Sequence, residues 1–414
     1  MFNYRINTKS IHHRWERSPK KGGRLIGPWA IIAVLLAWPV LVLIQPTPAI
    51  GGEPRLHQTT PVDNSGKPWR LGYLEGGAYN DYLPVFKSIV ENLVRLGWIE
   101  NPDRPCLQQA CSTRQAWDCL AGPAGGRFIE FASDAYWSAD WDADKRRANL
   151  DDFLARTREK KDLDLMIAMG AWAGRDLAAA SHHTPTIVCS TSNAVASGII
   201  RSPEDSGLDH VHARVDPTRY ARQIRLFHEI AKFKTLGVVF EDTVEGRTYA
   251  GLDQIQPVAA AKGFQIIPCH APFANVDQRT ADETAVKCYE KLATETDAIY
   301  IAIHRGVNKG NMKKILAPLI KNRVPNFAMG TLYEVRYGAM MSMAQPDFDY
   351  AGRFYAETMA KVLNGAKPRD IGQILEDPQA ICVNIEAARL VGFDFPMSIL
   401  GGADEIVREI EAPE

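Results

Sequence analysis

The chain has 414 residues, of which 46% are hydrophobic and 23% are charged, which is ordinary for a folded protein of two or three domains. This composition excludes a mainly disordered chain, a collagen and a protein with many membrane spans. Residues 1–24 carry seven Lys or Arg and one Glu, so the rest of the chain has 41 basic and 48 acidic side chains. An acidic body lacks the clustered Lys and Arg that bind nucleic acid, so we expect no nucleic-acid partner.

The first 49 residues have the pattern of an export signal. Residues 1–24 form a basic flank, and Leu25 to Ile44 is an uncharged apolar run long enough to cross a bilayer. Because the basic flank stays in the cytoplasm, we expect the body in the periplasm or another extracytoplasmic space. Residues 25–49 are either a signal peptide cut after Ala49 or a retained membrane anchor. Residues 50–67 are predicted to be a linker.

From Trp69 onward, short apolar runs alternate with amphipathic stretches. Strands are predicted over 70–74, 128–132, 163–168, 186–189, 211–215, 236–240, 264–268, 298–303, 326–329, 339–344 and 380–384. Helices are predicted over 81–96, 144–160, 172–180, 217–232, 246–262, 282–294, 309–322 and 349–364. This alternation is typical of the α/β class, with parallel sheets covered by helices on both faces. The number of strands is too large for one sheet, so we expect two doubly wound lobes.

The seven cysteines contain no CxxC pair, which argues against a zinc site or a redox dithiol. Cys106, Cys111 and Cys119 lie in an irregular polar segment at 101–126, where two of them can form a disulfide. Cys189 and Cys382 lie in apolar strand-like runs and are predicted to pack in the core. We expect no metal site and no cofactor.

Ligands of open α/β sheets bind beyond the carboxyl ends of the strands, so the residues after each strand are candidates for a binding site. Six polar loops follow predicted strands, and four of them contain glycine. Their candidate residues are Glu75, Gly76, Gly77 and Tyr79; Gly170, Ala171 and Trp172; Ser190, Thr191, Ser192 and Asn193; Glu241; His304 and Arg305; and Gly330, Thr331 and Glu334. Each loop alone could merely cap the next helix, as Asp81 can, but together they converge on one cleft if two lobes face each other.

Two other segments lie near predicted strands. Tyr136 and Trp137 are predicted in an aromatic loop after 128–132, where they either flank a ligand or pack beneath the next helix. Arg214 and Arg219 follow a strand that His210 and His212 flank. We interpret this segment as a crossing between lobes with a charged surface, with a metal site as the alternative.

The residue types in these loops favour an anionic ligand. Segments 170–173 and 190–193 are predicted helix starts, whose free N–H groups suit an anion, and Arg305 is a candidate bidentate partner from the other lobe. Glu75 or Glu241 remains for an amino group. The loops therefore predict a small carboxylate-bearing solute, such as an amino acid or an aromatic acid, with a neutral sugar as the alternative. No P-loop, dinucleotide fingerprint, zinc-protease motif or nucleophile elbow occurs, so we expect no enzyme and no catalytic residue.

Three segments, Leu71–Gly77, Leu165–Gly174 and Ile381–Gly392, resemble the solute-binding proteins of ABC transporters. The resemblance is to the type I periplasmic binding protein class, in its tryptophan-receptor-like branch, and runs from about Trp69 to Ile406. It implies two lobes joined by three crossings, which close on a small-molecule ligand by a hinge motion and dock on an ABC permease.

On this resemblance, lobe one would be 68–213 plus 346–370, and lobe two would be 216–345 plus 371–410. We expect a monomer or a weak dimer. The alternative function on the same scaffold is a membrane-tethered sensory ligand-binding protein.

Overall fold

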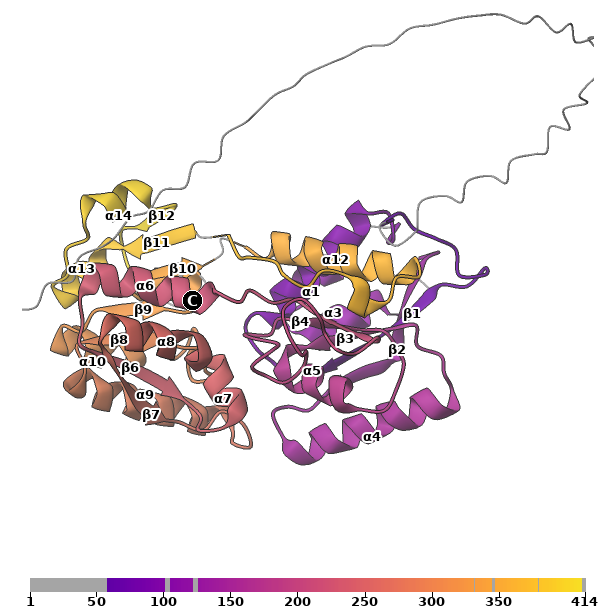
Figure 1. Ribbon diagram of the computed structural model, residues 1–414, viewed down its shortest axis with the longest axis horizontal. Helices are drawn as coiled ribbons and strands as arrows, with labels where there is room; N and C mark the ends of the chain where they lie inside the picture. The colour runs from indigo at the N-terminus through magenta and orange to yellow at the C-terminus, as the bar shows by residue number, and fades with distance from the viewer. Residues whose placement is uncertain are drawn as a thin grey trace, which may run out of the picture. The chain divides into compact units, whose positions relative to one another are not determined.

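The computed structural model describes residues 58–100, 105–121, 126–330, 332–344, 347–378 and 380–411. The predicted export segment at 1–49 and the first part of the predicted linker lie outside these residues. Among the helices of the described ranges, none is both long enough and apolar enough to cross a membrane. The described elements form two sheets, each covered by helices (Figure 1).

Lobe one contains a five-stranded parallel sheet in the order β2-β1-β3-β4-β5. Its strands are β1 (Trp69–Glu75), β2 (Ile129–Ser138), β3 (Leu165–Met169), β4 (Thr186–Cys189) and β5 (Val211–Ala213). Its helices are α1 (Tyr82–Arg95), α2 (Pro105–Gln109), α3 (Thr113–Leu120), α4 (Ala143–Glu159), α5 (Gly170–Ala179) and α12 (Asp349–Leu363), with α12 packed on α1. Every residue of β3 is buried, because helices cover both faces of the sheet.

Lobe two contains a seven-stranded sheet in the order β12-β11-β10-β9-β8-β6-β7. Its strands are β6 (Thr235–Phe240), β7 (Gln265–His270), β8 (Ala298–Ile301), β9 (Asn326–Ala328), β10 (Met341–Ala344), β11 (Ala380–Asn384) and β12 (Glu405–Val407). Its helices are α6 (Arg219–Ala231), α7 (Val244–Tyr249), α8 (Leu252–Lys262), α9 (Gln278–Glu295), α10 (Met312–Asn322), α11 (Leu332–Arg336), α13 (Ile385–Val391) and α14 (Met397–Gly402). Tyr300 of β8 belongs to the core that contains residues of α6 and α8, whereas its neighbour Ile299 belongs to the core of α9 and α10. All described pairings are parallel except that of β10 with β11.

The chain passes between the lobes three times: from β5 to α6, from β10 to α12, and from the short 3-10 helix η3 (Pro368–Asp370) to β11. The first and third passages lie side by side, since the N–H of Val215 donates to Gln373 O at 2.9 Å and that of Leu375 donates to Val215 O at 3.1 Å. The predicted fold class, two doubly wound lobes joined by three crossings, is confirmed. The residue boundaries given for the lobes stay a prediction.

The structure contains α11, α13, α14 and β12 where no element was predicted, and three predicted segments have a different form. The strand predicted at 128–132 continues as β2 to Ser138, so Tyr136 and Trp137 lie in a strand and not in a loop. The single helix predicted at 246–262 is two helices, because Gly251 adopts a φ of 65° between them. The segment predicted as irregular at 101–126 contains α2 and α3.

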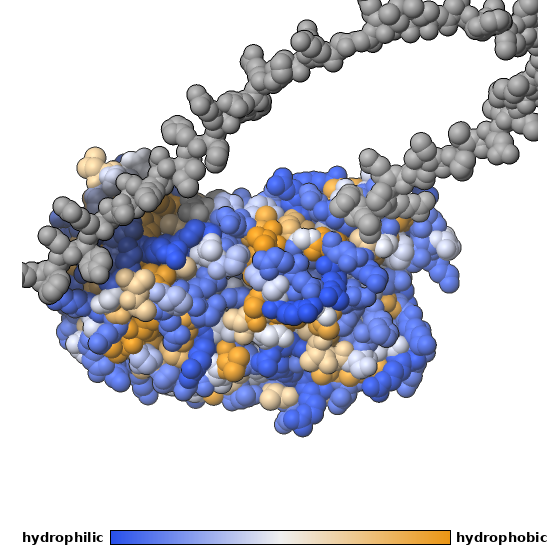
Figure 2. Space-filling view, viewed as in Figure 1, coloured by the Kyte–Doolittle hydropathy of each residue, from blue (hydrophilic) through white to orange (hydrophobic). Residues whose placement is uncertain are grey.

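Two disulfides are present. Cys106 and Cys119 join α2 to α3, and Cys269 and Cys288 join the edge strand β7 to α9, a pair that the sequence did not indicate. Cys189 and Cys382 are free and fully buried, as predicted, whereas Cys111 is free and exposed. The face of the molecule shown in Figure 2 is largely hydrophilic, with small separate apolar areas.

Candidate functional site

A cavity between the lobes contains about 780 Å³ of empty space, part of it open to solvent. Residues of both lobes and of the crossings line it. Six of the predicted candidates lie there: Tyr79, Ala171, Ser190, Thr191, Ser192 and Gly330.

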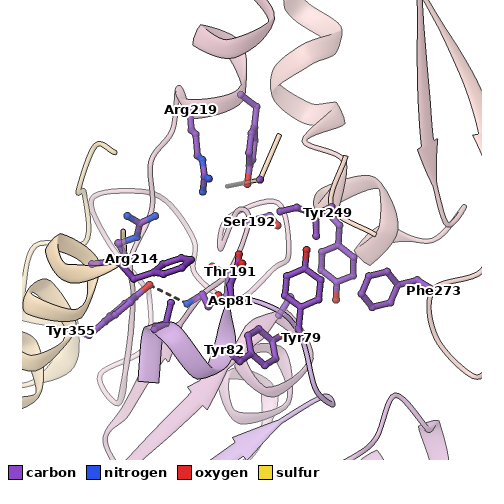
Figure 3. Close-up of a pocket in the computed structure, with 18 of the residues that line it drawn as sticks. Tyr79, Asp81, Tyr82, Thr191, Ser192, Arg214, Arg219, Tyr249, Phe273 and Tyr355 are labelled. Atoms are coloured by element: carbon purple, nitrogen blue, oxygen red, sulfur yellow. Dashed lines mark hydrogen bonds between the residues drawn. The ribbon is translucent and has the colours of Figure 1, made fainter. Parts of the chain in front are cut away.

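Two arginines of the first crossing and of α6 form one end of this cavity (Figure 3). Arg214 and Arg219 share one buried carboxylate, Asp377. Arg214 Nη1 donates to Asp377 Oδ1, and Arg219 Nε lies 3.1 Å from Asp377 Oδ2. The Tyr350 hydroxyl adds a hydrogen bond of 2.5 Å to the same carboxylate.

Burial alone would raise the pKa of Asp377, but the charges of Arg219 and Arg214 outweigh it and hold the pKa well below its ordinary value. Asp377 is therefore ionised, and it neutralises only one of the two guanidinium groups. These three side chains together keep one positive charge, and a further carboxyl that interacts with Arg219, that of Asp81, lines the same cavity. We predicted a charged surface at this crossing, but the Arg214 and Arg219 side chains are only 9% and 18% exposed.

Asp81, just before α1, also lines the cavity. Burial raises its pKa to about 6, although the charge of Arg219 acts in the opposite direction. Asp81 was predicted as a helix cap, but its side chain makes no capping hydrogen bond, since its backbone is already helical with φ −85° and ψ −18°. Its carboxylate therefore remains for a ligand.

Aromatic side chains form the other end of the cavity, where Figure 3 shows Tyr79, Tyr249 and Phe273. The ring centroid of Phe273 lies 5.0 Å from that of Tyr249 and 5.0 Å from that of Trp141. Such spacing is typical of packed aromatic pairs. These rings come from both lobes and form flat apolar surfaces against which a planar ligand could pack.

Three predicted glycines act by making room for these rings and do not line the cavity themselves. A Cβ atom at Gly76 or Gly77 would lie 2.9 Å or 2.7 Å from the Trp141 side chain. A Cβ atom at Gly170, which has a φ of 84°, would likewise clash with the side chain of Tyr82, which lines the cavity.

Glu75, Tyr136 and Trp137 lie outside this cavity. Because β2 extends to Ser138, the Tyr136 hydroxyl reaches Glu75 and donates a hydrogen bond of 3.0 Å. Glu75 also accepts hydrogen bonds from the Tyr73 and Thr113 hydroxyls, at 2.8 and 2.9 Å. Burial raises the pKa of this carboxyl, and the network ties α3 to the end of β1. Trp137 Nε1 donates to Asp152 on α4 at 2.7 Å.

Trp172 and Asn193 also lie elsewhere. The Trp172 ring is behind Trp141, at 5.5 Å, and under the guanidinium of Arg146, at 4.4 Å. No helix directly follows Ser190, where we predicted a helix start, and the Ser190 N–H donates to the Tyr355 hydroxyl. Asn193 Nδ2 donates to Asp253 of lobe two at 2.6 Å, so it joins the lobes.

In lobe two, Glu241, His304 and Arg305 hydrogen-bond the backbone of the loop at 271–277. They hold this loop and are not among the residues that line the cavity. Glu334 is buried with its carboxylate against Gly330, and Thr331 lies outside the described residues. Within the described residues, no group of three or more His, Cys, Asp or Glu side chains is placed to hold a metal ion.

A family model described as ABC transporter substrate binding protein matches residues 137–407 of this chain. No curated protein sequence matches the chain significantly.

Among solved structures, a conserved domain protein of Vibrio cholerae and an ABC domain of Streptococcus pneumoniae in complex with L-Trp are both similar in fold. Each has a TM-score of 0.62 and 16% identity, and each alignment covers 82% of this chain and 100% of the other. The ligand-free, open structure of a substrate binding protein with adhesive properties from Clostridium difficile has a TM-score of 0.54 and 17% identity, with the same coverage. These likenesses show the type I periplasmic binding protein fold.

Proposed function

The chain belongs to the family of ABC transporter substrate-binding proteins, and from this premise we propose that it is the extracytoplasmic receptor of an importer. The proposed ligand is a small carboxylate-bearing solute with an aromatic body, such as an aromatic amino acid. The observation that carries this proposal is the pair of guanidinium groups, Arg214 and Arg219, that share one carboxylate beside a wall of aromatic rings.

The anionic end of the ligand is assigned to the arginine end of the cavity. Arg214 and Arg219 keep one positive charge beyond the charge of Asp377, and the hydroxyls of Thr191 and Ser192 line the same cavity. Charge-assisted hydrogen bonds from a guanidinium to a carboxylate are among the strongest in proteins. The sequence pattern predicted this role for Arg305, but Arg305 hydrogen-bonds the loop at 271–277 instead.

The amino group of the ligand is assigned to Asp81, in place of Glu75 or Glu241. With a pKa of about 6, Asp81 is mainly ionised at pH 7.5 and can pair with an ammonium group. The aromatic body then lies among Tyr79, Tyr249 and Phe273. The L-Trp of the Streptococcus pneumoniae relative is a molecule of this chemistry, which supports the proposal.

Calorimetric titration with four probes tests this assignment. L-tryptophan and indole-3-propionate carry the carboxylate, tryptamine lacks it, and D-glucose is neutral. We expect the two carboxylates to bind, and Arg219→Ala to weaken their binding by about 1.5–3 kcal/mol, the range for a hydrogen bond to a charged group.

Arg201→Ala is the matched control, since Arg201 is exposed and pairs with Asp205 on the surface of lobe one. It should leave the affinity unchanged. Binding of D-glucose without binding of either carboxylate would contradict the proposal that the ligand bears a carboxylate.

The site of action follows from the family and from the basic, then apolar, N-terminal sequence. A reporter that is active only outside the cytoplasm, fused after residue 60, should be active. A silent reporter on a soluble, intact fusion would contradict the extracytoplasmic role.

A further inference from the structure

The loop at 271–277 leaves lobe two between β7 and α9 and reaches lobe one. The N–H of Asn275 donates to Trp141 O at 2.9 Å, and its side-chain Oδ1 accepts from the N–H of Ala143 at 3.0 Å. Two residues before Asn275, the ring of Phe273 packs against Trp141 inside the cavity. One short loop thus contacts both the ligand cavity and the backbone of the opposite lobe.

The backbone on both sides of this contact is unusual. Asn275 adopts a φ of 57°, and Asp140 and Trp141 adopt φ values of 51° and 61°. Left-handed backbone is unfavourable for most residues and persists only where neighbouring contacts stabilise it. Asn is among the few residues that tolerate it, and its short side chain lets both hydrogen bonds form together.

Lobe two holds this loop firmly from behind. Glu241 Oε1 accepts from the N–H groups of Phe273, at 2.9 Å, and Ala274, at 3.2 Å. Arg305 Nη1 donates to Phe273 O at 2.6 Å and to Val276 O at 3.2 Å. The loop therefore moves with lobe two, and its contact with lobe one exists only when the lobes are together.

We propose that the 271–277 loop is a clasp between the lobes, in which Asn275 sets how long the ligand is retained. This proposal rests on the proposed ligand-binding function. The Asn275 hydrogen bonds stabilise the closed arrangement and contribute nothing to an open one, so they act on ligand dissociation. Glu241 and Arg305 are positioning residues that affect the ligand through the loop.

Asn275→Gly is the most direct test, because Gly keeps the positive φ and the N–H donor and removes only the Oδ1 acceptor. With L-tryptophan as the probe in stopped-flow fluorescence, we expect the dissociation rate to rise by roughly three- to tenfold, the equivalent of one hydrogen bond. The association rate should not fall, because the open arrangement that admits the ligand loses no contact. Asn275→Asp keeps an acceptor at this position and should restore slow dissociation.

Asn364→Gly makes the same change at the end of α12 within lobe one and should not alter either rate. Arg305→Ala should raise the dissociation rate in the wild-type background and have little further effect in Asn275→Gly. Independent, additive effects of these two changes would show that Arg305 does not act through the loop.

Small-angle scattering of the ligand-free protein separates failure of the clasp from failure of the proposed function. Asn275→Gly should increase the radius of gyration, whether or not L-tryptophan binds. An unchanged radius together with an unchanged dissociation rate would overturn the clasp. An increased radius in a protein that binds no carboxylate would retain the clasp and refute only the proposed ligand.

Discussion

Gly170 makes room for Tyr82: a Cβ atom at position 170 would lie 1.8 Å from the Tyr82 hydroxyl oxygen. Tyr82 is buried and lines the cavity, so the shape of the site depends on the absence of a side chain at the start of α5.

Gly170→Ala should therefore displace Tyr82 and weaken ligand binding as well as lower stability by about 1–3 kcal/mol, since Ala also strains a positive φ. Urea denaturation and calorimetric titration measure the two effects. Gly198→Ala is the matched control, because Gly198 has a φ of 70° but nothing within 4 Å of its added Cβ. A similar loss of binding in both variants would show that strain, and not Tyr82, causes the effect.

Asp377→Asn should remove the carboxylate that Arg214 and Arg219 share and leave these two buried guanidinium groups without their common ion-pair partner. Breaking a buried ion pair in this way costs about 3–5 kcal/mol of the free energy of unfolding. Urea denaturation at pH 7.5 measures this cost, and a bound carboxylate ligand should recover part of it. Asp209→Asn, at an exposed pair with Lys367, should have little effect.

We expect the free energy of unfolding to fall in mild acid because three histidines are buried. Burial is the main cause that lowers the pKa of His182, His212 and His304 to about 4. In the unfolded chain a histidine has a pKa near 6.5, so between about pH 6.5 and pH 4 the unfolded state takes up protons that the folded state does not. The contribution of these residues therefore falls as the pH falls through this window.

Asp81 acts in the opposite direction, because its raised pKa favours the folded state as the pH falls below about 6. A variant of one histidine separates the histidine contribution to the pH dependence of stability from that of Asp81. His182→Phe keeps an aromatic ring beside Phe153, and Leu177 O keeps its contact with His210. Urea denaturation between pH 7.5 and pH 4.5 should show a shallower loss of stability for this variant, and an unchanged slope would contradict the assignment.

The thiol count is a test of the cysteine pairing. Cys111 is the free exposed thiol, whereas Cys189 and Cys382 are free and buried. The native protein should therefore react with one equivalent of a thiol reagent, and the denatured, unreduced protein with three. Five reactive thiols after denaturation would show that one of the two disulfides is not formed.

Much of the fold follows from local sequence patterns. The apolar run of β3 and the apolar run of β4 are buried on both faces, so their hydrophobicity marks them directly. β12 was missed, because a short edge strand with partly exposed residues carries little of this signal. The extension of β2 was missed for a different reason, since its residues after Ala132 are mixed in polarity.

The site was less predictable than the fold. The rule that ligands lie beyond strand ends located Tyr79, Ala171 and the serines and threonine after β4. It did not locate Arg214, Arg219 or Tyr350, which come from the crossings and α12 and meet only in the tertiary structure. The sequence feature that could have pointed to them was the pair of arginines close together in the predicted crossing. Their charge in the sequence did not indicate that they pair with Asp377, which lies more than 150 residues further along the chain, or that they are buried.

The pairing of Val215 with Ile374 ties two of the three passages together, so we expect the proposed hinge motion to turn about a line near these residues. Arg214 precedes Val215, and Asp377 lies three residues after Ile374, so their charges shift little during that rotation. On the proposed function, an anionic solute entering the open form would meet the same arginine pair as in the closed form. We therefore expect its association rate to decline as ionic strength rises.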